Sequence, residues 1–430
     1  MKKTVLIVGG GGRCHAIADA LSRSPQVGKI YCAPGNAGIA SIAECVPLKE
    51  TMTAELRDFA IANSVDLTVV GPEVALAAGI ADEFTRAGLR IFGPSAAAAE
   101  IESSKDFAKR LMTEYSVPTA SFETFDDYDA ALAHVKESPL PVVLKYDGLA
   151  AGKGVVIAET LSEAEAALKD MLLDDIYGKG RVVIEEFLTG PEFSLMCFTD
   201  GRDVYPMTLA QDHKRIFEGD KGPNTGGMGA YSPLPFVTEA DLGFAVEKIM
   251  KPVAAGLVDK GRPFKGVLYG GLMKTPSGIK VIEFNCRFGD PETEVVLPLL
   301  ESDIYDIFSA VADGTPMPEI RWSGKSAIGF VMASKGYPGE YRKGFEIKGL
   351  DAASSDPDIR IYHMGTSFGS TPAAGAEKAV MTSGGRVLMV VGFGDTLESA
   401  RDKALEAIGK IECENLQYRR DIGWRVLKKI

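Results

Sequence analysis

Two oxygen-bearing side chains, Glu283 and Asn285, lie two positions apart at the end of an apolar run. Alternate residues of a strand share one face, so this pair is expected to point into a cleft while Ile282 and Phe284 pack in the interior. A carboxylate and an amide oxygen provide part of a coordination shell for Mg²⁺, which phosphates and water complete. Arg287 would continue the polar face and hold an anionic substrate or transition-state oxygen. The alternative is an exposed polar strand face, which is common in antiparallel sheets.

A glycine-rich loop, Gly148–Gly154, carries a lysine near its tip. It is not a Walker A loop, because three residues rather than four separate its first glycine from Gly152, and Lys153 is followed by glycine rather than Ser or Thr. Strand-like segments on both sides instead predict a hairpin flap that can lie over a triphosphate. Lys145, just before the flap, and Lys153 would add positive charge. The alternative is an ordinary turn.

A second glycine-rich loop, Gly9–Arg13, follows a strand-like run and opens a helix-like segment. Exposed N–H groups and the helix dipole make such a loop a candidate anion site. The dinucleotide fingerprint does not fit, because its third glycine position holds Cys14 or His15 and the second strand ends in Cys32–Pro34, without an acidic residue. A nicotinamide dehydrogenase is therefore a poor match. A tight turn that packs a helix on a sheet remains the alternative.

The elements that must position these residues fall into three units. The first hundred residues alternate strand-like and helix-like patterns, which predicts a parallel, doubly wound sheet with ligand-binding loops at the carboxyl ends of its strands. From about Ile101 helices flank antiparallel-looking strands, and a third unit begins near Ser326. The fold class is thus a multidomain combination of α/β and α+β. The expected elements include one helix over Val74–Ala87, one strand over Val204–Gln211 and one helix over Glu292–Leu300.

Composition limits the partners. The 430-residue chain has a net charge of −12, which argues against nucleic acid or an anionic membrane surface as the main partner. No apolar run approaches the ~20 residues that span a bilayer, and the N-terminus does not resemble a secretory signal, so a cytoplasmic protein is expected. The six cysteines are far apart, with neither disulfide-framework nor zinc-ligand spacing, and most are expected to be packed thiols.

Together these features resemble the ATP-grasp superfamily and, within it, the phosphoribosylamine–glycine ligase family. The matching stretches span nearly the whole chain in the order of the family. They are Pro34–Gly38, Val70–Glu73, Ser104-Lys105, Asp147–Val155, Val183–Leu188, Gln211–Arg215, Gly222–Tyr231, Ile282–Glu292, Gly336–Gly339 and Arg420–Arg425.

The resemblance implies a Rossmann-like N-terminal domain (residues 1–101), a central ATP-grasp domain (102–325) with a mobile lid at about 118–187, and a small C-terminal α+β domain (326–430). It also implies that ATP lies between lid and core. The residues expected at ATP are Lys105, Lys145, Gly152, Lys153 and Gly154 near the phosphates, Glu185, Glu186, Phe187 and Leu188 along adenine, and Glu192 at the ribose.

The same resemblance implies a reaction. Glycine is activated by ATP as an acyl phosphate, and the amine of 5-phosphoribosylamine then displaces phosphate. The implied residues are Glu283 and Asn285 for Mg²⁺, or Mn²⁺ in its place; Asp212, Lys214 and Arg287 as catalytic residues; Gly226 and Gly227 around glycine; and Gly12, Arg13, Asn36 and Glu73 facing phosphoribosylamine. These small molecules are the only partners expected, and the chain is expected to be a monomer.

Two positions depart from the family pattern. Cys14 stands where a glutamate is usual, and Tyr146 stands beside the flap where a small residue is usual. Two other functions remain open at this point. A sibling ATP-grasp ligase or carboxylase with another acid substrate would share the flap and the Glu283–Asn285 pair but not Gly222–Tyr231. A catalytically idle nucleotide-binding protein would not need Lys145 and the metal pair intact.

Overall fold

The computed structural model describes residues 2–150, 154–369 and 378–427. Its first unit is a parallel sheet in the order β3-β2-β1-β4-β5, which confirms the predicted doubly wound sheet. The central strand is buried on both faces, with Leu6 and Val8 in one core cluster and Val5 and Ile7 in the other. The elements are β1 (Lys3–Gly9), α1 (Gly12–Ser22), β2 (Val27–Pro34), β3 (Glu44–Cys45), α2 (Thr53–Ala62), β4 (Leu67–Val70), α3 (Glu73–Ala77), α4 (Ile80–Arg86) and β5 (Ile91–Phe92).

Three predicted elements are wrong in their extent. The helix over Val74–Ala87 is two helices, because Gly79 between α3 and α4 has a φ of 85°, a left-handed conformation that interrupts a right-handed helix. The strand over Val204–Gln211 is two short strands, β11 (Val204–Pro206) and β12 (Gln211–Asp212), which belong to different sheets. The helix over Glu292–Leu300 consists of α11 (Thr293–Val296) and a 3₁₀ turn at Leu297–Leu299 that contains Pro298.

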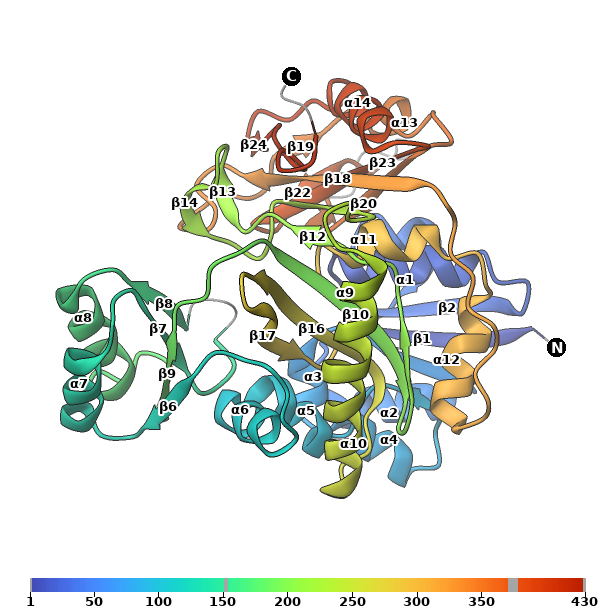
Figure 1. Ribbon diagram of the computed structural model, residues 1–430. Coiled ribbons are helices and arrows are strands. Elements are labelled where there is room, and N and C mark those ends of the chain that lie inside the picture. Colours follow the sequence, from blue (N-terminus) through green and yellow to red (C-terminus); the bar gives the residue numbers. More distant parts are fainter. Residues whose placement is uncertain (1, 151–153, 370–377, 428–430) are drawn as a thin grey trace.

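A small unit projects from one side of the molecule, at the left of Figure 1. It is an antiparallel sheet in the order β6-β9-β7-β8, on which α7 and α8 pack around a separate core that includes Leu144, Leu168 and Val182. Strands β7 and β8 pair antiparallel on either side of the glycine-rich loop, so the predicted hairpin is confirmed. The elements are β6 (Phe122–Phe125), α7 (Tyr128–Glu137), β7 (Val142–Tyr146), β8 (Val155–Ala158), α8 (Leu161–Leu172) and β9 (Val182–Glu186).

The centre of the molecule is an antiparallel sheet in the order β11-β10-β16-β17. A register shift between Gly271 and Leu272 of β16 places Glu283 of β17 opposite Gly271, a residue without a side chain. The elements are β10 (Glu192–Asp200), β16 (Lys265–Thr275) and β17 (Gly278–Asn285), with helices α5 (Ala96–Ser103), α6 (Lys105–Glu114), α9 (Glu239–Ala245), a π-helical turn (Val246–Met250), α10 (Lys251–Asp259) and α12 (Ile304–Asp313).

The last sheet, in the order β12-β15-β18-β23-β20, combines two parts of the chain. Strands β12 and β15 precede the C-terminal unit in sequence but belong to its sheet, because β15 pairs with β18 and β12 pairs with β15. The segment between them contains β13 and β14. The remaining elements are β13 (Arg215–Phe217), β14 (Lys221–Asn224), β15 (Gly229–Ser232), β18 (Ser326–Ser334), β19 (Glu346–Ile347), α13 (Leu350–Ala353), β20 (Ile359–His363), β21 (Thr366–Phe368), β22 (Val380–Thr382), β23 (Arg386–Gly394), α14 (Leu397–Ile408) and β24 (Leu416–Gln417).

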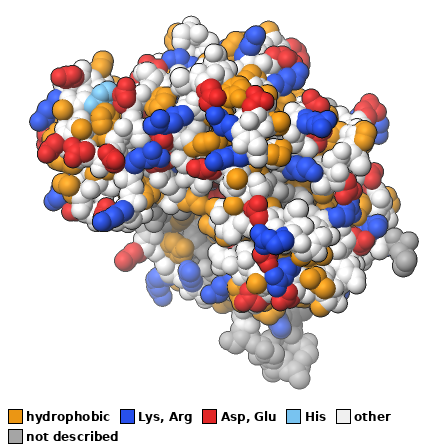
Figure 2. Space-filling view, turned by 90° about the horizontal axis from the view of Figure 1, so that it is seen from below, with side chains coloured by type: hydrophobic (Ala, Val, Ile, Leu, Met, Phe, Trp, Pro, Cys, Tyr) orange, Lys and Arg blue, Asp and Glu red, His pale blue; other side chains and the backbone are white. Residues whose placement is uncertain are grey.

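The surface carries both signs of charge. On the face shown in Figure 2, acidic and basic side chains are interspersed with single apolar residues, as is typical of a surface that contacts water. None of the helices in the described part of the chain has the length and apolarity to cross a membrane. All six cysteine thiols are free, as predicted.

Candidate active site

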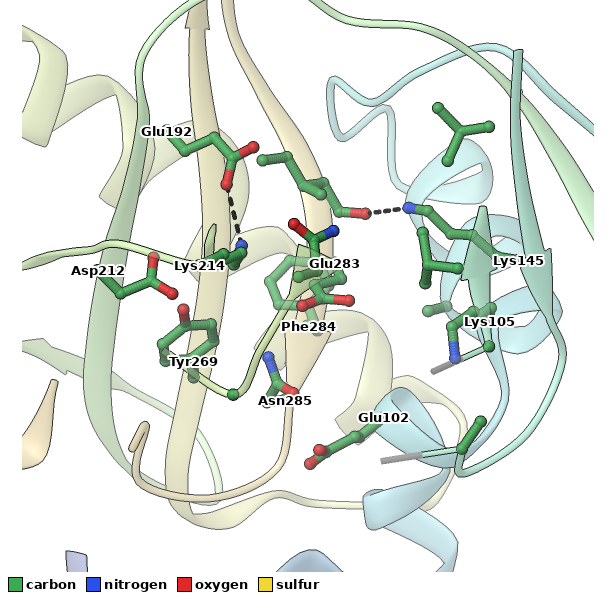
Figure 3. Close-up of a pocket in the computed structure, with 18 of the residues that line it drawn as sticks. Glu102, Lys105, Lys145, Glu192, Asp212, Lys214, Tyr269, Glu283, Phe284 and Asn285 are labelled. Carbon is green, nitrogen blue, oxygen red and sulfur yellow. Dashed lines mark hydrogen bonds and ion pairs between the residues drawn. The ribbon is translucent and has the colours of Figure 1, made fainter. Parts of the chain in front are cut away.

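A cavity of about 470 Å³ lies between the central sheet, the projecting unit and the C-terminal sheet. Figure 3 shows its centre, where Lys145 reaches from β7 toward the strand that carries Glu283 and Asn285. The Lys145 ammonium donates to the carbonyl oxygen of Ile282 at 2.9 Å. Side chains from three sheets therefore meet at one cavity, although they are far apart in the sequence.

The carboxylate and amide at the end of β17 both line this cavity. Burial alone would raise the pKa of the Glu283 carboxyl, but the nearby cations, Lys214, Lys145 and Lys105 foremost, together lower the pKa. Glu283 is therefore ionised. The Oδ1 of Asn285 accepts a hydrogen bond from Nη2 of Arg287 at 3.0 Å, which fixes the direction of the amide oxygen and leaves its second lone pair for a cation.

A buried lysine pair shares one carboxylate at the other side of the cavity. Glu185 lies 2.8 Å from Lys109 and 2.8 Å from Lys145, and all three side chains are buried. Burial lowers the pKa of Lys109 to about 8, and Glu185 opposes this shift. Lys105, the first residue of α6, donates to the carbonyl oxygen of Gly148 at 3.1 Å; burial lowers its pKa and Glu283 opposes this. The lysines thus concentrate positive charge beside the glycine-rich loop.

The shared carboxylate leads to a stability prediction. Glu185→Gln should lower the free energy of unfolding by about 3–5 kcal/mol, because it leaves two buried ammonium groups without a counter-charge. Chemical denaturation at pH 7 measures the change. The neighbouring Glu186→Gln is the matched control: Glu186 pairs with Lys280 at the exposed surface, and its loss should cost at most about 1 kcal/mol. Equal effects for the two variants would contradict the buried-pair account.

A second charged group lies across the cavity, at the edge of the central sheet. Glu192 and Lys214 form an ion pair at 2.9 Å, drawn as a dashed line in Figure 3. The Lys214 ammonium lowers the pKa of Glu192, and the Glu192 carboxylate raises that of Lys214 well above its usual value. Burial raises the pKa of Asp212, Lys214 opposes the rise, and Glu292 and Glu192 add to it. This corner can therefore hold a proton on Asp212 or bind an ammonium group.

Arg287 sits at the centre of a third cluster. Its Nη2 lies 2.9 Å from Glu102, and its Nε lies 3.3 Å from Oε2 of Glu73. The same Glu73 oxygen is 3.5 Å from Nη1 of Arg13, at the start of α1. Burial would raise the pKa of Glu73, but Arg13 and Arg287 together lower the pKa. The Glu73 carboxylate, at the start of α3, is thus held between two arginines at the wall of the cavity.

The structure brings most of the predicted site residues together. Gly12, Asn36 and Gly227 do not line the cavity. Gly12 packs against Glu294 and Met364. The Asn36 amide donates to the carbonyl oxygens of Gly10 and His363 and accepts from two backbone N–H groups of its own loop. Gly152 and Lys153 lie outside the described residues. The predicted residues that line it are Arg13, Glu73, Lys105, Lys145, Gly154, Glu185, Glu186, Phe187, Leu188, Glu192, Asp212, Lys214, Gly226, Glu283, Asn285 and Arg287.

Sequence reasoning missed several residues of the cavity. Glu292 accepts hydrogen bonds from Tyr269 at 2.8 Å and Ser194 at 2.9 Å, and Asp290 pairs with Arg386 at 2.9 Å. Glu292 lies within a stretch that the family resemblance includes, which is a signal that could have found it. Arg386 lies in a segment without any such motif, and only the sheet pairing of β23 brings it to the cavity.

The two departures from the family pattern fit their surroundings. Cys14 is buried, which raises the pKa of its thiol to about 12, so it is a packed thiol and not a reactive thiolate. Tyr146 is also buried, and its hydroxyl donates to the carbonyl oxygen of Gly178 at 3.2 Å. Gly148 and Gly180 lie against its ring, where an added Cβ would come within 2.6 Å of ring atoms. Glycines thus accommodate the larger side chain.

A glycine-rich hairpin above a charged antiparallel sheet, with a parallel N-terminal sheet beside it, defines an ATP-grasp enzyme. Residues 3–102 match the N domain of phosphoribosylglycinamide synthetase, residues 103–293 its ATP-grasp (A) domain, and residues 327–425 its C domain. The chain belongs to the phosphoribosylglycinamide synthetase family, whose members are also called phosphoribosylamine–glycine ligases. Membership implies that it binds ATP.

Individual relatives are similar in sequence to this chain over nearly its whole length. A phosphoribosylamine–glycine ligase of Halalkalibacterium halodurans is 49% identical over 425 residues, which cover 98% of this chain and 97% of that protein. One of Neisseria meningitidis is 47% identical and covers 99% of this chain and 100% of its own. The crystal structure of the phosphoribosylamine–glycine ligase of Thermotoga maritima superposes with a TM-score of 0.83 at 32% identity, covering 97% of this chain and 100% of that one.

Proposed function

We propose that this chain joins glycine to 5-phosphoribosylamine, forming glycinamide ribonucleotide, ADP and phosphate through a glycyl phosphate, as a step of purine biosynthesis. Family membership over the full length supports this reaction. One observation assigns the proposed reaction to this cavity: the ionised Glu283 and the oxygen of Asn285 face Lys105 and Lys145 in it. Such an arrangement suits a polyphosphate with its counter-cation.

The residues present fit a magnesium ion. Glu283 supplies an anionic oxygen and Asn285 a neutral one, which is the number of protein ligands Mg²⁺ commonly takes beside phosphates. When bound, Mg²⁺ or Mn²⁺ would neutralise phosphate charge. Lys105 and Lys145, which now contact the carbonyl oxygen of Gly148 and the carboxylate of Glu185, would hold phosphate oxygens from the opposite side of the cavity.

The chemistry proceeds in two displacements. A carboxylate oxygen of glycine attacks the terminal phosphorus of ATP, and ADP leaves. The amine nitrogen of phosphoribosylamine then attacks the carbonyl carbon of glycyl phosphate, phosphate leaves, and the amine loses a proton. Both steps join negatively charged partners, so the main contribution of the protein is orientation and charge neutralisation.

We place glycine at Asp212, Lys214, Gly226 and Gly227. Burial disfavours the charge on Asp212, so the carboxylate would be stabilised by the ammonium of an amino acid, and Lys214 supplies positive charge for the carboxylate of the same molecule. Arg287 would neutralise the acyl phosphate. Arg13 and Glu73, with Gly12 and Asn36 behind them, would face phosphoribosylamine from the N-terminal sheet. ATP would extend from Lys145 along Glu185–Leu188, with Glu192 at its ribose.

A substrate panel tests the reaction. ADP formation should require glycine, phosphoribosylamine and Mg²⁺ together, and mass spectrometry should find glycinamide ribonucleotide in equal amount. Alanine and serine in place of glycine are the controls. Release of ADP with another acid but not with glycine would assign the chain to a sibling ATP-grasp reaction and contradict the proposal.

The remaining predictions concern organisation. We propose that the domain boundaries follow residues 101 and 325, and that residues 118–187, approximately, form a lid that moves as a unit. We also propose that the protein is a monomer and is located in the cytoplasm. The separate hydrophobic core of the α7–α8 unit supports independent motion of the lid. Sedimentation of the purified protein tests the monomer.

A further inference from the structure

Arg386, the first residue of β23, reaches from the C-terminal sheet into the cavity and touches two different segments there. Its Nη1 lies 2.8 Å from the carbonyl oxygen of Gly226. The same atom lies 2.9 Å from Oδ1 and 3.0 Å from the backbone oxygen of Asp290. One guanidinium group therefore connects the segment between β14 and β15 to the segment that follows β17.

The two segments also touch each other directly. Gly227 has a φ of 111°, and an added Cβ there would clash with Cδ of Pro291, so the loop packs closely on the residue after Asp290. Tyr337, another residue of the C-terminal unit, accepts a hydrogen bond from the backbone N–H of Gly226 at 3.1 Å. Two side chains of the C-terminal unit thus bind the backbone of Gly226: Tyr337 accepts from its N–H, and Arg386 donates to its carbonyl oxygen.

Asp290 is held from the N-terminal side as well. Its Oδ2 lies 3.5 Å from Nε of Arg13 and accepts a hydrogen bond from the Arg13 backbone N–H at 3.3 Å. Arg13 at the start of α1 and Arg386 at the start of β23 therefore share one carboxylate of the central unit. With Arg13 assigned to the amine substrate and Gly226 to glycine, Asp290 and Arg386 lie between the two halves of the site.

The charges around Asp290 depend on Arg386. Burial would raise the pKa of Asp290, but Arg386 opposes this most strongly, followed by Arg13, and with Arg287 also contributing the pKa is lowered. Glu294 of α11 is fully buried, and neither of its oxygens has a hydrogen-bond partner in the described part of the protein. Burial and the Asp290 charge raise the pKa of Glu294 well above its usual value. Asp290 thus carries the negative charge and Glu294 the proton.

We propose that Arg386 is a positioning residue for the ligase reaction: by binding the Gly226–Gly227 loop and Asp290 at once, it fixes the acyl-phosphate half of the cavity against the amine half. This inference rests on the proposed function. Arg386 needs no contact with a substrate for this role. The role requires a positively charged donor at the position of Nη1, because that one nitrogen contacts both segments.

The experiment compares Arg386→Gln and Arg386→Lys with the parent enzyme. Arg386→Gln should lower kcat/KM for phosphoribosylamine by about 100-fold, the loss expected when two reacting groups are misplaced. The KM for ATP should change less than about threefold, because no contact of Arg386 with the ATP-binding lysines exists among the described residues. Arg360→Gln is the matched control: its described hydrogen bonds go only to the carbonyl oxygens of Pro357 and Ile359, and it should behave like the parent.

The pH profile separates positioning from a purely structural role. Without Arg386 the pKa of Asp290 rises, so the acidic limb of kcat/KM in Arg386→Gln should move to higher pH. Arg386→Lys should return this limb toward its parental position while leaving most of the rate deficit, because lysine restores the charge but, with its shorter side chain, does not place a nitrogen where Nη1 lies. Guanidinium ion at millimolar concentration should raise the activity of Arg386→Ala, and urea should not.

These outcomes distinguish two failures. If the parent enzyme does not join glycine to phosphoribosylamine, the proposed function is wrong. If the parent is active but Arg386→Gln keeps its kcat/KM, Arg386 is not a positioning residue. The same holds if Arg386→Gln loses activity with an unmoved acidic limb and guanidinium does not rescue Arg386→Ala. Thermal unfolding of each variant, within a few degrees of the parent, shows that the comparison is made on folded protein.

Discussion

Glu283→Gln should lower kcat by at least about 1,000-fold while the protein stays folded. The substitution keeps the size of the side chain and removes the one ionised oxygen that β17 contributes among the proposed metal ligands. Lys105 and Lys145, whose charges now face Glu283, would then bind the triphosphate without the cation that completes its neutralisation. Steady-state ADP formation at saturating glycine and amine measures the change.

The control for this variant is Glu102→Gln, which removes a nearby cavity carboxylate that pairs with Arg287 but is not a proposed metal ligand. We expect a smaller loss for Glu102→Gln, and no change in its dependence on Mg²⁺ concentration. Glu283→Gln should in contrast require a much higher Mg²⁺ concentration for its residual activity. Turnover of Glu283→Gln at the parental rate would refute the metal assignment.

Arg287→Lys should reduce kcat by about 100-fold. Lysine keeps the positive charge but cannot contact Glu73, Glu102 and Asn285 at the same time, as the guanidinium does at 3.3, 2.9 and 3.0 Å. The amide oxygen of Asn285 would lose its orientation, and the developing negative charge of the acyl phosphate would lose a directed donor. Single-turnover kinetics isolates the chemical steps from product release.

Arg90→Lys is a suitable comparison, because Arg90 pairs with Asp313 by two nitrogens on the far side of the N-terminal sheet and does not line the cavity. It should keep the parental rate. An Arg287→Lys enzyme with unchanged single-turnover rates would show that charge alone suffices at this position and would contradict the role of the fork.

Local patterns predicted the parts of the site that single elements determine. The period of a strand placed Glu283 and Asn285 at the cavity, and the glycines between two strand-like runs predicted the β7–β8 hairpin. The parallel N-terminal sheet followed from strand–helix alternation. For the metal pair and the hairpin the information lies in neighbouring residues, and for the parallel sheet it lies in the order of elements along the first unit, so no knowledge of the tertiary fold was needed.

Contacts between distant segments were not predictable in this way. The sequence pattern around Lys109 predicts a surface lysine on an amphipathic helix. Lys109 is instead buried against Glu185, because α6 and β9 meet at this point. The sequence pattern places Arg386 at the start of an apolar strand. Its position at the cavity follows only from the pairing of β23 with β18. The break at Gly79 depends on a backbone angle that Gly permits but does not require.

The central claim is that Glu283 and Asn285 hold a cation against a nucleotide whose phosphates Lys105 and Lys145 contact. A crystal structure of the protein grown with ADP and Mn²⁺, recorded at the manganese edge, tests it most directly. We expect an anomalous peak at coordination distance from the Glu283 carboxylate and the Asn285 amide oxygen, adjoining the phosphates. A bound nucleotide with both side chains turned away and no peak between them would contradict the account.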